Sequence, residues 1–211
     1  MALLSPAWSR VTVSDHPYRW CHLPPFTFLP RPVATELART FPEDRFRLRD
    51  ASARASKSYV NRSRVVVSPE GDRDDDLPAL WNELVDELLS PGYGAAVARL
   101  LGVAPPRALE IRLVRHDAGC WLAPHTDRAD KCFSHVLYFN EPWRDDWGGH
   151  FQVLASERPD STVARVSPRL GASVMSARSE RSWHAVAPVR AEGPHTPAGL
   201  VRRSLLVHGL V

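Results

Sequence analysis

Residues 108–116 read ALEIRLVRH, and this stretch decides the fold class because its apolar and polar side chains alternate. Leu109, Ile111 and Leu113 occupy every second position, which is the pattern of a β-strand with one buried face. Further short strands are expected at 134–140, 150–156, 161–167, 172–177, 184–189 and 201–210. Turn residues separate these segments at intervals of roughly ten residues, a spacing typical of an antiparallel sandwich or barrel.

The part of the chain before these strands has helical patterns instead. Residues 32–41 (PVATELARTF) predict a short helix that begins at its proline, and residues 77–101 place leucines at helical spacing. The pair Pro91-Gly92 interrupts this second segment. Helices that precede strands in this way indicate an α+β order.

Residues 50–76 form the most polar stretch of the chain. They include several arginines, an acidic run from Asp72 to Asp76 and a possible short strand at 64–67. We interpret the stretch as a solvated surface loop. The alternative is a mobile lid over a substrate site, because long loops are either functional or disordered.

The composition is that of a globular protein, with 44% hydrophobic and 24% charged residues in a chain of 211. We expect one compact domain, in which residues 1–107 form a helical support and lid region and residues 108–211 form a β core. The sequence contains no apolar run of membrane-spanning length and no recognisable secretion signal at its start. A membrane partner is therefore not expected.

Charge and cysteine content restrict the partners and the compartment. The net charge of +3 is too small to require nucleic acid as a partner. The three cysteines, Cys21, Cys120 and Cys132, are an odd number without CxxC spacing. They predict a reducing, cytoplasmic location and neither a disulfide framework nor a zinc knuckle.

His125, Thr126 and Asp127 form an H-x-D triplet between two predicted strands. An imidazole and a carboxylate two positions apart can point to the same side of an extended chain and bind one metal ion. His184, at the start of a later strand, is the candidate for a third ligand. Two imidazoles and one carboxylate make up the facial triad of non-haem Fe(II) oxygenases, although zinc accepts the same ligands.

The last predicted strand carries a candidate anion site. Arg202 and Ser204 share one face of this strand and Arg203 points the other way, because side chains alternate along a strand. A guanidinium binds a carboxylate through two parallel hydrogen bonds, and a hydroxyl adds one more. Arg202 is therefore the candidate for holding one carboxylate of a dicarboxylic cosubstrate whose other end chelates the metal.

These motifs resemble one family when they are taken in order. The segments RLVRHDAGCWLAPHTD, HVLYFNEPWRDDWGGHFQVL, RSWHAVAPV and RRSLLVHG present H-x-D, Y-x-N, Gly-Gly, H-x-V and R-x-S in succession. Residues 109–211 thereby resemble the Fe(II)/2-oxoglutarate-dependent dioxygenases, particularly the prolyl-hydroxylase-like branch. The resemblance implies a mainly β fold, a double-stranded β-helix or jelly roll with a helical amino-terminal portion.

The resemblance also implies a metal and cosubstrates. It implies Fe(II), 2-oxoglutarate and O₂, with ascorbate as an expected stimulant. His125, Asp127 and His184 match the iron ligands of the family and would be its catalytic residues. The carboxylate of Asp127, which related halogenases lack, favours hydroxylation.

Four further residues match positions around the cosubstrate. Arg202 matches the arginine that pairs with the far carboxylate of 2-oxoglutarate, and Tyr138 matches a tyrosine that hydrogen-bonds the same carboxylate. Ser134 and Ser204 match supporting hydroxyl positions. His116 stands where the family commonly has a tyrosine, a departure that concerns how the metal-proximal end of the cosubstrate is held.

The function implied by the resemblance is an oxygenase with succinate and CO₂ as coproducts. We expect it to hydroxylate a small molecule, an amino acid or a natural-product intermediate, because the chain is compact. The alternatives are a prolyl-type hydroxylase acting on a protein or peptide and, in another class, a non-catalytic metal-binding jelly-roll module. The oligomeric state is left open. Candidates for binding an acidic group of the substrate are Arg54, Lys57, Arg62, Arg64, Arg128 and Arg178.

Overall fold

The computed structural model describes residues 2–53, 58–190 and 196–211. The helices within them are η1 (Pro6–Arg10), α1 (Arg31–Arg39), α2 (Ala79–Leu89), α3 (Pro91–Leu101) and η2 (Asp145–Trp147), where η marks a 3-10 helix. The strands are β1 (Trp20–Leu23), β2 (Arg47–Asp50), β3 (Tyr59–Val67), β4 (Ala108–Asp117), β5 (Trp121–His125), β6 (Lys131–Tyr138), β7 (Phe151–Leu154), β8 (Thr162–Val166), β9 (Ser173–Ala177), β10 (His184–Val186) and β11 (Val201–Leu210).

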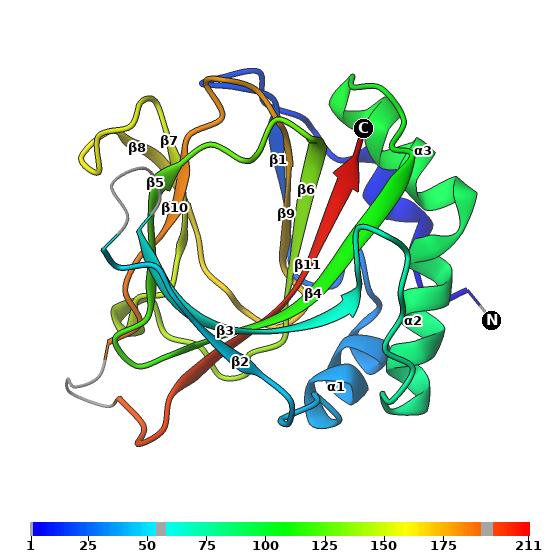
Figure 1. Cartoon of the computed structure of the whole chain (residues 1–211), viewed down its shortest axis with the longest axis horizontal. Helices are drawn as coiled ribbons and strands as arrows, with labels where there is room; N and C mark the ends of the chain where they lie inside the picture. Colours follow the sequence, from blue (N-terminus) through cyan, green and yellow to red (C-terminus); the bar gives the residue numbers. More distant parts are fainter. Residues whose placement is uncertain (1, 54–57, 191–195) are drawn as a thin grey trace.

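The strands join one sheet in which neighbours run antiparallel. Its order is β1-β9-β6-β11-β4-β3-β5-β10-β7-β8, with β2 beside β3. The sheet curls around a central space into a nearly closed barrel (Figure 1). This arrangement confirms the predicted jelly-roll-like β fold. Strands β1, β2 and β3 come from the part of the chain before residue 108, so that part adds strands to the sheet as well as helices.

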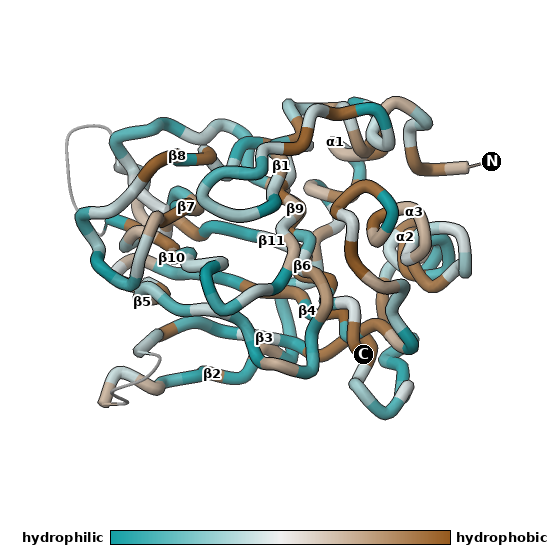
Figure 2. Tube along the Cα trace, turned by 90° about the horizontal axis from the view of Figure 1, so that it is seen from above, coloured by the Kyte–Doolittle hydropathy of each residue, from teal (hydrophilic) through white to brown (hydrophobic). Residues whose placement is uncertain are grey.

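The three α-helices pack on one side of the barrel (Figures 1 and 2). Trp81 of α2 is fully buried, and its indole N–H donates to the backbone carbonyl of Leu37 in α1 at 3.2 Å. Pro91 begins α3, where a missing backbone N–H costs nothing, and Gly102 ends it in the left-handed conformation at φ 65°. The helices confirm the predicted segments. None of the described helices is both long and apolar enough to span a bilayer.

The two faces of the sheet differ in chemistry, and β11 shows this most clearly. Leu205 and Val207 belong to the hydrophobic core that the helices cover. Alternate residues of the same strand, Arg202, Ser204 and His208, line a central cavity instead. The interior of the barrel therefore holds charged and polar side chains among apolar ones such as Leu206, and the largest hydrophobic cluster lies between the sheet and the helices.

The prediction of a surface loop at 50–76 is wrong at its centre. There β3 runs through the sheet and pairs with β4 and β5. Arg64 on this strand is only 3% exposed and forms ion pairs with Asp44 and Asp74 at 2.8 Å each. The physical reason is that both faces of β3 are covered: Asn61 and Ser63 line the cavity, and Arg64 on the opposite face is covered by its acidic partners. Residues 54–57 of the suggested lid lie outside the described part of the chain.

Candidate metal and cosubstrate site

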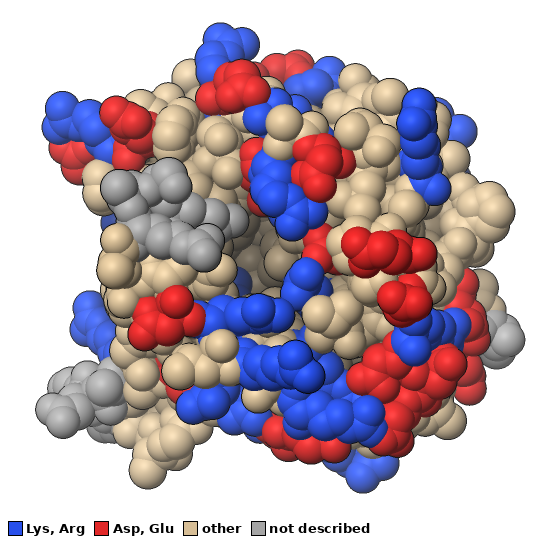
Figure 3. Space-filling view, in the orientation of Figure 1, with Lys and Arg blue, Asp and Glu red and all other residues tan. Residues whose placement is uncertain are grey.

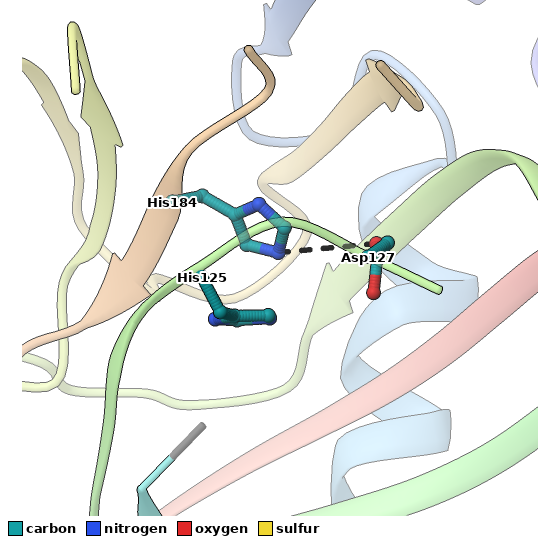
Figure 4. A group of neighbouring side chains, drawn as sticks. All are labelled: His125, Asp127 and His184. Carbon is teal, nitrogen blue, oxygen red and sulfur yellow. Dashed lines mark ion pairs between the residues drawn. The ribbon is translucent and has the colours of Figure 1, made fainter. Parts of the chain in front are cut away.

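Three residues that are separated in the sequence meet inside the barrel and are called the metal triad here: His125, Asp127 and His184. Strand β5 ends at His125 and β10 begins at His184, and these two residues are partners across the antiparallel pair. The three ligand atoms lie within 4.8 Å of one another, and all three residues are buried. Figure 4 shows the side chains turned toward one another, with His184 Nε2 at 3.9 Å from Asp127 Oδ2.

The two imidazoles are oriented by the same kind of contact, a hydrogen bond to a backbone carbonyl two residues earlier in the chain. Nδ1 of His125 lies 2.9 Å from the carbonyl oxygen of Ala123, and Nδ1 of His184 lies 2.9 Å from that of Ser182. A carbonyl only accepts, so each Nδ1 carries the proton and donates it. The lone pair is then on Nε2 of each ring, which is the protonation state that a metal ligand needs.

The Asp127 carboxylate is held on both oxygens. Lys131 donates from Nζ to Oδ1 at 2.8 Å, and Ser134 donates from Oγ to Oδ2 at 2.6 Å. His208 lies behind both partners, 3.0 Å from Lys131 Nζ and 2.7 Å from Ser134 Oγ. Burial by itself raises the pKa of Asp127, but the charge of Lys131 holds it well below its usual range. The carboxylate is therefore ionised and oriented.

Ser134, which the family match places among the residues that support the cosubstrate, lines the central cavity. Its hydroxyl is bound to Asp127 and His208. Ser134 and Ser204 sit on different strands, β6 and β11, and only Ser204 contacts Arg202. Ser134 lies four residues before Tyr138 on the same face of β6. The two residues are therefore roughly 13 Å apart along the strand, since each residue adds about 3.3 Å.

A second cluster surrounds Arg202 and is called the anion pocket here: Arg202, Ser204, His116 and Tyr138. Arg202 is 2% exposed. Its Nε donates to the carbonyl of Gly149 at 2.8 Å, and its Nη1 donates to Ser204 Oγ at 3.3 Å and lies 3.3 Å from His116 Nδ1. The guanidinium carbon lies 4.9 Å from the centre of the Tyr138 ring.

The anion pocket lacks a negative charge of its own. Among the described residues, Arg202 forms no ion pair with any carboxylate. The Tyr138 hydroxyl and His116 Nε2 are buried and have no hydrogen-bond partner in the described part of the chain. A buried cation and buried unpaired donors are unfavourable unless an anion completes them. A carboxylate fits this pocket in charge and in donor geometry.

Arg203, the neighbour of Arg202, points to the other face of β11. It forms an ion pair with Glu43 at 2.6 Å and its side chain is 35% exposed. Arg128 binds Asp130 at 2.9 Å with 55% of its side chain exposed, and it also lines the central cavity. The remaining candidates for an acidic substrate group differ in placement. Arg62 binds Asp117, Arg64 is internal, Arg178 binds Glu180, and Arg54 and Lys57 lie outside the described residues.

One cavity of about 510 Å³ contains both clusters. Its lining includes all three residues of the metal triad and, from the anion pocket, Arg202, Ser204 and His116. The space-filling view shows a hollow on this face of the molecule, with Lys and Arg side chains along its border (Figure 3). Two imidazoles and a carboxylate suit Fe(II), and an oxo-acid chelated there could reach a guanidinium in the same cavity with a second carboxylate.

Sequence reasoning missed several residues of this site. Lys131 and His208 had no assigned role, and Tyr18 was not singled out at all. Tyr18 is buried, and burial, followed by the charge of Asp127, raises the pKa of its hydroxyl. One feature of the sequence could have drawn attention to Lys131. It is one of only two lysines in a chain whose other Lys/Arg positions are arginines.

Comparisons with known proteins agree with this geometry. Residues 111–207, which contain every residue of the metal triad and the anion pocket, match the family model of the 2OG-Fe(II) oxygenase superfamily. No curated protein matches the sequence.

Most of the chain is similar in fold to solved structures. A prolyl-4-hydroxylase from Pseudomonas putida matches with a TM-score of 0.63 at 20% identity, covering 90% of this chain and 91% of the other. A prolyl hydroxylase from Trichoplax adhaerens, in complex with a hypoxia inducible factor peptide fragment, matches with a TM-score of 0.67 at 14% identity, covering 90% and 83%. The epimerase SnoN from nogalamycin biosynthesis matches with a TM-score of 0.57 at 15% identity, covering 90% and 78%.

At these identities the solved structures establish the fold, and the family model matches the part of the chain from residue 111 to residue 207. The matched region brings together a His-Asp-His set that can bind a metal ion. The match over residues 111–207, together with this ligand set, therefore supports an enzyme of the 2OG-Fe(II) oxygenase kind, a superfamily that uses Fe(II), 2-oxoglutarate and O₂.

Proposed function

We propose that His125, Asp127 and His184 bind Fe(II) and that Arg202 pairs with the distal carboxylate of 2-oxoglutarate. In this proposal Ser204 and Tyr138 support the same carboxylate. The observation that supports this proposal is that one cavity contains both the three buried residues of the metal triad and the buried guanidinium of Arg202. This guanidinium has no carboxylate partner among the described residues. Together these features provide both ends of a site for a metal-chelating dicarboxylate.

The residues of the chain have separate tasks. The carbonyls of Ala123 and Ser182 hold the two imidazoles with Nε2 toward the metal position. Lys131 and Ser134 keep the Asp127 carboxylate oriented. When bound, iron and cosubstrate supply the chemistry of the family, in which 2-oxoglutarate is converted to succinate and CO₂ while the substrate is oxidised. The buried setting limits the access of water to this reaction.

We propose a small molecule as the substrate, and hydroxylation as the reaction. A cavity of about 510 Å³ that also receives the cosubstrate leaves space for a compact molecule. The lining carries an excess of positive charge, which favours an acidic group such as the carboxylate of an amino acid. The charged lining residues are Arg49, Arg112, Arg128, Lys131 and Arg202 against Glu110 and Asp127.

The second candidate is hydroxylation of a prolyl-type residue in a peptide or protein. It is favoured by the likeness of the fold to two prolyl hydroxylases, one of which was solved with a peptide. The small molecule is favoured by the cavity and by the likeness to an epimerase of nogalamycin biosynthesis. We also propose a cytoplasmic location, because the three cysteines are unpaired and buried.

The test is a turnover assay with Fe(II), 2-oxoglutarate, O₂ and ascorbate. Amino acids, natural-product intermediates and proline-containing peptides are screened by mass spectrometry for a gain of one oxygen atom. We expect a small molecule to gain oxygen with one succinate formed per product, and Asp127→Ala to abolish both. Oxygen gained only by peptides would favour the second candidate. Absence of succinate in every reaction, together with tight zinc binding, would contradict both and favour the non-catalytic module.

A further inference from the structure

His116 occupies a position inside the barrel beside the buried guanidinium. It lies on β4, and its partner across the sheet is Arg202 on β11. It is 3% exposed and lines the same cavity as the metal triad. The imidazole is therefore part of the wall against which a ligand of Arg202 would lie.

The contact with Arg202 determines the tautomer of this imidazole. Nδ1 of His116 lies 3.3 Å from Nη1 of Arg202, and a guanidinium nitrogen can only donate. Nδ1 is therefore the acceptor and carries no proton, so the single proton of the neutral ring is on Nε2. Among the described residues, this buried Nε2 has no hydrogen-bond partner.

The ring is neutral as well as oriented. Burial first, and the charge of Arg202 second, hold the pKa of His116 well below the ordinary value for histidine. A neutral N–H adds a hydrogen bond to an anion without adding a second charge that Arg202 would repel. A buried donor left without an acceptor is unfavourable, which indicates that a ligand supplies the acceptor.

We infer that Nε2–H of His116 donates a hydrogen bond to the distal carboxylate of 2-oxoglutarate, beside Arg202. This inference rests on the proposed function and adds a residue to it. The family match associated this position with the metal-proximal end of the cosubstrate, whereas the contact with Arg202 associates it with the far end. A carboxylate has two oxygens with several lone pairs, so it can accept from His116 and Arg202 together.

The first experiment measures binding without turnover. The dissociation constant of 2-oxoglutarate for the Mn(II)-loaded protein is determined by isothermal titration calorimetry in the absence of O₂. His116→Phe keeps a ring of similar size and removes the donor, and we expect affinity to fall roughly 10- to 100-fold, as for the loss of a hydrogen bond to a charged group. His116→Gln, which can place an N–H at a similar reach, should recover most of the affinity.

A second ligand separates a direct contact from a structural effect. The acid 2-oxopentanoate has the same carbon chain as 2-oxoglutarate but lacks the distal carboxylate. If His116 binds that carboxylate, His116→Phe should change the affinity for 2-oxopentanoate by no more than about twofold. An equal loss of affinity for both ligands would mean that His116 only shapes the barrel and would overturn the inference.

The matched control is His135, a second buried histidine whose Nε2 has no hydrogen-bond partner in the described part of the chain. It lies on the helix-covered side, where its Nδ1 is 2.8 Å from the Tyr93 hydroxyl. His135→Phe should leave the affinity for 2-oxoglutarate unchanged. A similar loss in this variant would attribute the effect of His116→Phe to general loosening of the fold and would count against the inference.

A spectroscopic measurement avoids substitution altogether. In the wild-type protein loaded with Zn(II), nitrogen-15 NMR of the imidazoles should show His116 protonated on Nε2, with that proton shifting when 2-oxoglutarate is added. Protonation on Nδ1, or no shift, would overturn the inference even if His116→Phe failed to fold. If the wild-type protein binds no 2-oxoglutarate at all, the proposed function fails as well. If it binds and His116→Phe binds equally, only the inference fails.

Discussion

At the scale of single residues, the site depends on charges that are buried with particular partners. Arg202 holds a positive charge inside the barrel with neutral neighbours only, and Asp127 is paired with a buried lysine. Removing one partner of a buried ion pair leaves the other charge without compensation, which costs several kcal/mol, on the order of 3–5. In the proposed function each of these buried charges has a task, Asp127 at the metal and Arg202 at the cosubstrate.

The two adjacent arginines of β11 provide a direct comparison at this scale. We expect Arg202→Ala to weaken the binding of 2-oxoglutarate to the Mn(II)-loaded protein by at least about 100-fold, because a charge-assisted bidentate contact is lost. Arg203→Ala should have almost no effect, since Arg203 faces Glu43 on the outside of the sheet. Isothermal titration calorimetry measures both. Equal losses in the two variants would mean that the wrong arginine has been assigned to the anion pocket.

At the scale of elements, the turn between η2 and β7 determines where the guanidinium lies. Gly149 has φ 68°, and its carbonyl accepts the hydrogen bond from Arg202 Nε at 2.8 Å. A Cβ at this position would lie 2.9 Å from the Trp143 ring and 3.1 Å from Arg202 Cδ. The turn therefore requires glycine both for its backbone conformation and for the close approach of Arg202.

We predict that Gly149→Ala destabilises the fold by about 2–4 kcal/mol, from the left-handed backbone and the crowding together. It should also weaken 2-oxoglutarate binding, because Arg202 must shift.

Gly119 is the control, because it has φ 82° and a Cβ added there would meet no atom within 4 Å. Gly119→Ala should therefore cost only about 1–2 kcal/mol and leave binding unchanged. Urea unfolding and calorimetry measure the two effects. Matching behaviour of the two variants would contradict the role given to the Gly149 contact.

At the scale of the whole molecule, the barrel brings together the proposed metal ligands from segments far apart in the chain. His125 and Asp127 belong to the end of β5 and the residues after it, and His184 belongs to β10. The pairing of β5 with β10 is part of what closes the barrel. A metal ion bound to all three residues would link these segments in the folded state only.

Metal binding should therefore stabilise the fold. At a free Mn(II) concentration 100 times the dissociation constant, linkage gives about 2.7 kcal/mol, which corresponds to a rise in Tm of roughly 5–10 °C for a chain of this size. EDTA, which removes the metal ion, should reverse this rise in Tm. His184→Ala should abolish the rise, while His22→Ala, at an exposed position on β1, should keep it. Differential scanning fluorimetry measures Tm, and an undiminished rise in His184→Ala would exclude His184 as a ligand.

Local patterns in the sequence determined much of this protein. The alternation in β4 and β11 predicted the strands, the leucine spacing predicted α2 and α3, and the H-x-D and R-x-S motifs identified side chains that the structure brings into one cavity. These features could be predicted because each depends on the residues within one segment. Side chains two apart on a strand share a face whatever the rest of the chain does.

Only the tertiary structure decided what surrounds those side chains. It made β3 an internal strand of the sheet although its sequence is polar, because alternate residues of β3 face a cavity that also holds the charged and polar residues of the site. It brought Lys131 and Ser134 to Asp127, and it set the tautomer of His116 through Arg202. Contacts between strands depend on register and on closure of the sheet, and no single segment of the sequence contains that information.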